Sequence, residues 1–318
     1  MSDTLTRLLF LFIDVILPLI TGYLFHKYKI ISLDTCNILL KVNVRVLIAI
    51  IGFGSFWLID IDKNIVLLVF LGFILCSAMP GIFSYPYATK KLLDIRDSGA
   101  FLIAIMLSNI GILGGLCAFI AMGQLAYAYV QVIAMAQNIF TLTVAFPLAE
   151  YFRQKYMAGS KKVKFKPRWR SILISWNQIG LVCMIIGTIF NLNHIPRPDL
   201  FDPIYNSFVH ISAWVGILPT GYLLNFAIAK RYKYTSYALL PIRFILTPLI
   251  CYLTTYFFTD NPLILTLSVL VGLCPVGINS IIVTQLYQLN THVAEANFLI
   301  TTALFILIIY PLFLLFML

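Results

Sequence analysis

Long apolar segments dominate the sequence, and short polar breaks separate them. About ten such segments lie roughly at residues 5–25, 40–58, 64–85, 99–121, 126–149, 172–190, 205–228, 236–258, 263–287 and 293–317. Each segment is long enough to cross a hydrocarbon core of about 30 Å, because a helix rises about 1.5 Å per residue. A β-barrel would show alternation over about ten positions instead of continuous runs. The pattern predicts an all-α polytopic membrane protein with about ten transmembrane helices.

Two of these segments are interrupted near their middles by polar and helix-weakening residues. Residues 108–115 read SNIGILGG, and residues 274–280 read CPVGINS. Glycine destabilises a helix, and Pro275 lacks a backbone N–H and clashes with the preceding turn. A broken helix frees backbone N–H and C=O groups, which the membrane tolerates only around a cavity or against other protein. We therefore expect the fourth and ninth helices to be discontinuous.

Composition supports the membrane class, and the charges predict the topology. Hydrophobic residues make up 61% of the 318 residues and charged residues 11%, whereas soluble domains carry about 25% charged residues. The basic residues fall in the connections after the first, third, fifth and seventh segments: His26, Lys27 and Lys29; Lys90, Lys91 and Arg96; RQKYMAGSKKVKFKPRWR; and Lys230, Arg231 and Lys233. The positive-inside rule places these connections in the cytoplasm and both termini outside.

The basic balance therefore has a membrane explanation. The net charge of +10 is mainly a topology signal beside anionic lipid, so no nucleic-acid partner is expected. Residues 5–25 lack a small-residue cleavage site and are expected to remain as a spanning helix. The expected localisation is the cell (inner) membrane, with the lipid bilayer and a second copy of the chain as partners.

A basic connection divides the chain into two halves. We expect a first five-helix repeat at 1–152, a cytoplasmic linker at 153–171 and a second repeat at 172–318. An odd number of spans in each half inverts the second half relative to the first. The offset that aligns GYLFHKYKI at 22–30 with GTIFNLNHI at 187–195 also aligns Asn109 with Cys274. Inverted repeats with helices interrupted at matching places indicate the binding site of a secondary transporter.

The two interruptions supply the candidate binding residues. Asn109 is expected about 15 Å into the membrane and Pro275 about 20 Å in from the other face, so that the helices cross near the midplane. Backbone N–H groups at half-helix starts suit a carboxylate, and asparagine adds a directional donor. The alternative is that glycines allow close packing and asparagines bond to neighbouring helices. The candidate substrate-binding residues are Asn109, Gly111, Gly114, Gly115, Pro275, Gly277, Asn279, Ser280 and, on the fifth segment, Asn138.

Asp14 is a separate polar residue in the first apolar segment, about 13 Å deep. A carboxylate there costs roughly 3 kcal/mol unless it is paired or protonated. Asp14 and, more weakly, Asn43 are candidates for coupling to H⁺ or Na⁺; the alternative is a neutral Asp14 bonded to a neighbouring helix. We expect Arg243 to extend its charge to the cytoplasmic interface. No basic residue is then expected where the fourth and ninth helices cross.

Enzyme chemistry has no support in the sequence. No Walker loop, nucleophile elbow, metal-binding histidine pair or dinucleotide fingerprint is visible. The six cysteines lie in apolar segments without paired spacing, which favours packing roles. We expect no enzyme activity, no cofactor and no metal.

The two interruptions resemble the auxin efflux carrier family, which includes carriers of malonate- and malate-like acids. SNIGILGG is similar to the Asn-x-Gly-Phe-Leu-Gly stretch of the family's fourth helix. CPVGINSIIVTQLYQLN and AEANFLITTALFILIIYPL are similar to its ninth and tenth helices. The resemblance implies a bile-acid-symporter-like fold, in which a scaffold domain supports a transport domain whose fourth and ninth helices cross at the substrate site. Leu116 departs from the family, which often has proline there.

The leading hypothesis is a secondary active transporter of a small carboxylate, auxin-, malonate- or malate-like, that works by alternating access. The first alternative is a cation/proton antiporter of similar architecture with Asp14 as the exchanging group. The second is a membrane sensor without transport.

Overall fold

The computed structural model describes residues 3–59, 64–92, 94–158, 179–224 and 226–317. Within these ranges the chain is helical, and its only β-pairing is an isolated antiparallel bridge between Ser108 and Val276. Six continuous helices are long and apolar enough to cross a membrane: Leu5–Lys27, Leu33–Leu58, Asn64–Lys90, Gln124–Ala158, Lys233–Phe258 and Thr291–Phe316. The protein is therefore an all-helical membrane protein, as the apolar segments predict.

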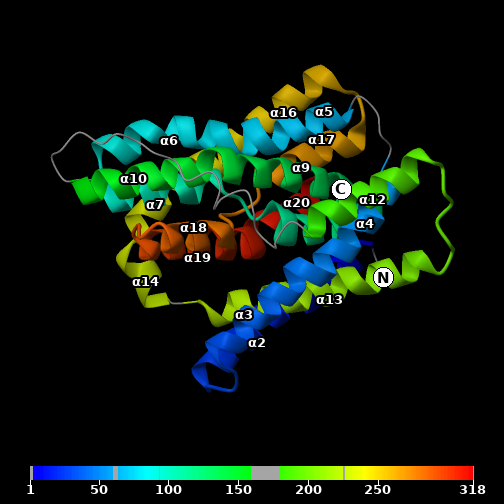
Figure 1. Ribbon diagram of the computed structural model, residues 1–318, viewed down its shortest axis with the longest axis horizontal. Coiled ribbons are helices and arrows are strands. Elements are labelled where there is room, and N and C mark those ends of the chain that lie inside the picture. The colour runs from blue at the N-terminus through cyan, green and yellow to red at the C-terminus, as the bar shows by residue number, and fades with distance from the viewer. Residues whose placement is uncertain (1–2, 60–63, 93, 159–178, 225, 318) are drawn as a thin grey trace.

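The helices pack in two bundles that do not follow the halves of the chain. The first bundle contains α1 (Asp3–Leu11), η1 (Phe12–Ile16), α2 (Leu17–Lys27), α3 (Leu33–Val42), η2 (Asn43–Leu47), α4 (Ile48–Leu58), α12 (Ile179–Leu192) and α13 (Phe201–Tyr222). In this bundle α13 lies against α2 and α3, and α12 lies against α4. Figure 1 shows α2, α3 and α13 side by side along one edge of the molecule.

The second bundle forms the larger part of the molecule. It contains α5 (Asn64–Phe70), η3 (Leu71–Ala78), α6 (Met79–Lys90), α7 (Ile95–Met106), η4 (Ile110–Gly114), α8 (Gly115–Met122), α9 (Gln124–Phe140), η5 (Thr141–Ala145), α10 (Phe146–Ala158), α14 (Phe226–Arg231), α15 (Lys233–Pro241), η7 (Ile242–Leu246), α16 (Thr247–Phe258), α17 (Pro262–Gly272), α18 (Ile278–Leu286), α19 (Thr291–Leu304), η8 (Phe305–Ile309) and α20 (Tyr310–Phe316). Short π-helical segments, labelled η, continue most of the long helices without a break.

Glycines set the close packing inside the first bundle. A Cβ on Gly22 would lie 2.0 Å from the carbonyl oxygen of Leu218, and one on Gly221 would lie 2.2 Å from that of Leu19. Both neighbours are backbone atoms, so no side-chain movement would relieve the contact. Small residues at these two positions therefore allow α2 and α13 to approach each other directly.

The predicted segments overlap the described helices, but several boundaries differ. The second helix begins at Leu33 instead of 40, and the fifth continues to Ala158, beyond its predicted end at 149 and into the predicted linker. We expected the seventh segment to extend over 205–228, but α13 ends at Tyr222 and α14 begins a separate helix at Phe226. Because α14 packs on α19, it belongs to the second bundle. The predicted linker at 153–171 and the start of the sixth segment lie largely outside the described residues.

Candidate functional site

The two interrupted segments meet each other inside the second bundle. Helix α7 ends at Met106 and α17 ends at Gly272, and the chain resumes as a helix at Ile110 and at Ile278. Between these ends the backbone N–H of Asn109 donates to the carbonyl of Pro275 at 2.8 Å. The N–H of Gly277 donates to the carbonyl of Leu107 at 2.7 Å. The fourth and ninth helices are therefore broken, and their breaks pair in antiparallel fashion; we call this pairing the helix crossing.

Side chains of neighbouring helices satisfy the remaining backbone groups at the helix crossing. With its side-chain amide oriented to satisfy both groups, Gln137 on α9 donates to the carbonyl of Ser108 and accepts from its N–H, both at 2.9 Å. The hydroxyl of Thr301 on α19 accepts from the N–H of Val276 at 3.1 Å. The amide of Gln131 donates to the carbonyl of Gly111 at 3.2 Å. These bonds stabilise extended backbone where water is excluded.

The crossing also contains a buried cation, which corrects our expectation for Arg243. We expected its charge to reach the cytoplasmic interface, but the side chain is fully buried. Its Nη1 donates to the hydroxyl of Ser108 at 2.7 Å, and its Nη2 donates to the carbonyl of Ile105 in the last turn of α7. The expectation was wrong because Arg243 lies too far along its helix, and its partners across the bundle replace water.

The surroundings of Arg243 are polar but carry no negative charge. Its Nη1 also lies 3.4 Å from the carbonyl of Cys76, and its Nε has no hydrogen-bond partner. The thiols of Cys76, Cys251 and Cys274 lie around it. Within the described part of the chain, no carboxylate forms an ion pair with this guanidinium. Arginine does not lose its proton in proteins, so the crossing carries a permanent positive charge.

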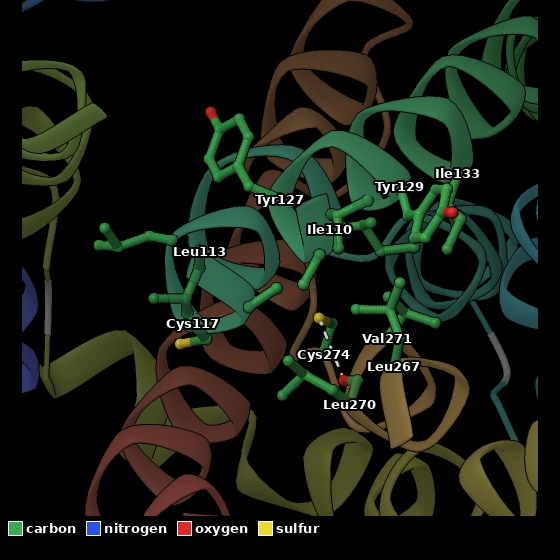
Figure 2. Close-up of a cluster of buried hydrophobic side chains, with 14 of the residues drawn as sticks. Ile110, Leu113, Cys117, Tyr127, Tyr129, Ile133, Leu267, Leu270, Val271 and Cys274 are labelled. Atoms are coloured by element: carbon green, nitrogen blue, oxygen red, sulfur yellow. Dashed lines mark hydrogen bonds between the residues drawn. The ribbon is translucent and has the colours of Figure 1, made fainter. Parts of the chain in front are cut away.

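Two glycines permit the approach of the broken segments. A Cβ on Gly114 would lie 2.6 Å from the sulfur of Cys274, and one on Gly277 would lie 2.8 Å from the carbonyl oxygen of Ser108. Figure 2 shows this region, with Ile110 and Cys117 on one segment and Cys274 on the other. By contrast, the nearest atom to a Cβ on Gly111 is the Cβ of Ala134 at 3.4 Å. The close approach of the two broken segments therefore explains why glycine occupies positions 114 and 277.

Two narrow recesses lie between the bundles and reach the crossing. The first recess is lined from the second bundle by Gly111, Ile112 and Tyr127, and from the first bundle by Ile48, Val209 and Ser212. The second recess is lined by Asn109, Ile278 and Thr302, and opposite them by Val15, Ile217 and Thr220. The Thr302 hydroxyl is buried without a hydrogen-bond partner.

The predicted binding residues are only partly brought together. Asn109 lines the second recess, and its side chain also accepts from the N–H of Leu113 at 3.5 Å. Asn279 is exposed in the first turn of α18, and Asn138 is exposed on α9; neither lines either recess. The buried hydroxyl of Ser280 donates to the carbonyl of Gly277 at 2.7 Å. Gly115 packs against Gln131 and Tyr127.

The two ion-coupling candidates lie in the first bundle. Asp14 in η1 is buried, and its carboxylate lies 2.7 Å from Nδ1 of His210 on α13. Asn43 in η2 is also buried, and its oxygen accepts from the hydroxyl of Ser212 at 2.7 Å, whereas its amide nitrogen has no partner. Asp14 is therefore bonded to a neighbouring helix, and its partner is itself titratable.

Sequence reasoning missed several residues of this region. Arg243, His210 and Thr302 were not among the candidates. A signal existed for Arg243: it follows the start of α15 at Lys233 by ten residues, which is about 15 Å along a helix. A charge at that depth indicates a functional role by default. His210 and Thr302 carried no signal, because single polar residues are common on helices.

Comparison with known proteins adds no family to these observations. No family model matches the chain, and no curated protein matches it. The class of the protein therefore rests on its fold and on the helix crossing: it is an all-helical membrane protein in which two broken helices pair around a buried arginine.

Proposed function

We propose that the chain is a secondary active transporter that carries a small organic anion, a carboxylate, across the membrane by alternating access. One observation carries the proposal: Arg243 is fully buried at the helix crossing, and among the residues that the structure describes no carboxylate pairs with it. An uncompensated buried charge is costly, and a bound anion offsets that cost. The positive crossing therefore favours an anionic substrate. Arg243 lines neither recess described above, so its charge would act on the anion through the crossing and not by direct contact in this conformation.

The half-helix ends support the same charge preference. Arg243 donates to the carbonyl of Ile105, one of the carbonyls that the end of α7 leaves without an intrahelical donor. It thereby covers the negative end of that half-helix. The starts of η4 and α18 present N–H groups, which carry partial positive charge and bind anions. The polar groups of Asn109 and Thr302 in the second recess add hydrogen-bonding partners for a carboxylate.

The packing supports different roles for the two bundles in transport. We infer ten transmembrane helices in two inverted repeats, with the 153–171 linker cytoplasmic and both termini external. The antiparallel pairing of the two breaks fits segments that enter the membrane from opposite sides. The first bundle would serve as the scaffold, and the second would move with its crossing to expose the recesses alternately. The sequences at 108–115 and 274–280 favour assignment to the auxin efflux carrier family. The protein would then lie in the cell (inner) membrane.

The alternatives fit the crossing less well. A cation/proton antiporter would place a cation beside the permanent charge of Arg243, which repels it. A sensor without transport would not require a buried charge between two broken helices. Asp14, the group that the antiporter hypothesis used, lies in the other bundle and is already bonded to His210.

A ligand screen tests the proposal directly. The purified protein is heated with mono- and dicarboxylates, including malonate and malate, with sodium present or absent. A ligand that binds only the folded state stabilises it by about 2.7 kcal/mol at one hundred times its Kd. We expect at least one carboxylate to raise the melting temperature of the wild type. Stabilisation by monovalent cations but by no carboxylate would contradict the proposal.

A further inference from the structure

The Asp14–His210 pair has an unusual position for two titratable groups. Asp14 has 2% of its surface exposed, and its Oδ2 lies 2.7 Å from Nδ1 of His210, 196 positions later in the chain. The imidazole stacks on Phe10 at 5.4 Å and meets the edge of Phe119 at 5.6 Å between ring centroids. Phe119 belongs to α8 of the second bundle, so His210 lies at the boundary between the bundles.

Few other charges act on the pair. Titratable groups on the elements packed around it fall into two sets. In the first bundle they are Arg7 on α1; Tyr23, His26 and Lys27 on α2; Asp34, Cys36 and Lys41 on α3; Arg45 on η2; and Asp202, Tyr205 and Tyr222 on α13. In the second bundle they are Cys117 on α8, Tyr127 on α9 and Tyr310 on α20. Asp202 is paired with Arg197 at 3.2 Å. Arg7 precedes Asp14 by about 10 Å along the helix and stays charged throughout.

One proton changes the net charge of this pair. Without it, a carboxylate faces a neutral imidazole and the pair is negative. With it, a carboxylate faces an imidazolium, or a carboxylic acid faces an imidazole, and the pair is neutral. Burial favours the neutral state, because an isolated buried charge is costly. The two groups lie 2.7 Å apart, so one proton can be shared between them.

The pair lies directly behind the walls of both recesses. Val15, next to Asp14, lines the second recess, and Val209, next to His210, lines the first. Each recess has room for about one water molecule in this conformation, so an anion that enters when a recess widens during the cycle would lie near the pair. A negative pair repels such an anion, and a neutral pair does not.

We propose that Asp14 and His210 form one proton-binding site, and that its proton and the transported anion bind cooperatively. The second half of this inference rests on the proposed function; the proton site itself does not. Coupling between two ligands is reciprocal, so the proton favours the anion and the anion favours the proton. The pair would thus make the transporter a proton–anion symporter.

The proton site is tested first without any substrate. The protein is labelled with ¹⁵N-histidine in lipid nanodiscs, and the His210 signal is identified among the four histidines by its loss in His210→Gln. We expect the pair to take up one proton as the pH falls, seen as a single change in the His210 signal. In Asp14→Asn this change should be altered, because the replacement removes one of the two groups that share the proton. No change in the His210 signal with pH, or the same change in Asp14→Asn, would overturn the site.

A second histidine–carboxylate pair provides a matched control. His292 Nδ1 lies 3.1 Å from Glu295, and its side chain is 56% exposed at the start of α19. Glu295→Gln should leave the His210 transition unchanged. It should move the His292 transition by less than Asp14→Asn moves that of His210, because solvent screens exposed pairs.

The cooperativity is tested in the wild type with malonate as the probe. Saturating malonate should raise the pH at which His210 gains its proton, by about one unit for a tenfold coupling. Malonate that raises the melting temperature but leaves this transition in place would refute the coupling and leave the proposed function intact. If no carboxylate in the screen stabilises the protein, the proposed function and the coupling fail together, and the proton site stands or falls on the titration alone. The titration with malonate does not use Asp14→Asn, so it decides the coupling even if that variant does not fold.

Discussion

The helix crossing and the Asp14–His210 pair each bury charge, but they balance it differently. At the crossing, the cation Arg243 bonds to hydroxyl and carbonyl oxygens and faces no described carboxylate. In the first bundle, the acid Asp14 is bonded to a histidine at 2.7 Å. The crossing keeps its charge at every physiological pH, whereas the pair gains or loses a proton.

This difference assigns the two regions different tasks. A permanent positive charge suits recognition of an anion, because its strength does not vary during the cycle. A pair that switches between negative and neutral suits coupling, because its effect on a nearby anion depends on the proton. Replacements at Arg243, Asn109, Gly277 and Ser212, with their controls, test this contrast, from the largest expected effect to the smallest.

The largest effect is expected at the buried cation. Arg243→Ala removes the charge and leaves the carbonyl of Ile105 and the hydroxyl of Ser108 without the donor that Arg243 supplies. We expect a loss of about 3 kcal/mol or more in the free energy of unfolding, and loss of carboxylate-dependent stabilisation in thermal unfolding. Arg243→Lys keeps the charge but not the geometry, so it should retain part of the carboxylate response. Full carboxylate stabilisation of Arg243→Ala would remove the anion assignment from the crossing.

The next effect concerns hydrogen bonding to the anion. Asn109→Ala should weaken carboxylate binding by about ten- to a hundred-fold, the worth of one hydrogen bond to a charged group. Asn109→Asp should be worse, because its charge repels an anion; a cation site predicts the opposite order. The same replacements at Asn279 should act less, because its side chain lines neither recess. Asn138→Ala, exposed on α9, is the control, and binding is measured by isothermal titration. Unchanged affinity in both Asn109 variants would exclude this side chain from the site.

Close approach at the crossing predicts a smaller, purely steric effect. In Gly277→Ala the new Cβ would lie 2.8 Å from the carbonyl oxygen of Ser108, a backbone atom that the pairing holds in place. We expect a loss of about 1–3 kcal/mol in the free energy of unfolding. Gly111→Ala is the matched control, since its Cβ would meet only ordinary contact at 3.4 Å. Chemical denaturation in detergent should separate the two variants, and equal stabilities would contradict the close approach.

The smallest effect is expected at a neutral contact beside the proton site. Ser212→Ala removes the hydroxyl that donates to Asn43 at 2.7 Å, two residues from His210. We expect a loss of about 0.5–1.5 kcal/mol in the free energy of unfolding, and no change in the pH at which His210 is protonated. If Ser212→Ala moves that transition as far as Asp14→Asn does, the proton site is not confined to the pair.

The membrane class and the breaks in two helices followed from the sequence alone. Apolar segments of membrane-spanning length predict helices because backbone groups in lipid must bond within their own segment. Pro275 and Gly277 predict the break in the ninth segment because each disfavours a regular helix locally. In the fourth segment the break falls at residues 107–109, before Gly111 and Gly114, which lie in the helical η4. These are short-range effects, so residues close together in the chain are enough to decide them.

The tertiary structure alone decided which polar groups meet. Arg243 lies inside an apolar segment of the sequence, but the sequence does not show whether its side chain reaches the interface or the interior. The guanidinium can be hydrogen-bonded in either place, by water at the interface or by polar groups inside the bundle. Its partners Ser108 and Ile105 lie more than 130 positions away, and His210 lies 196 positions from Asp14. The balance of a buried charge depends on neighbours across the bundle, and only the packing of the helices brings those neighbours together.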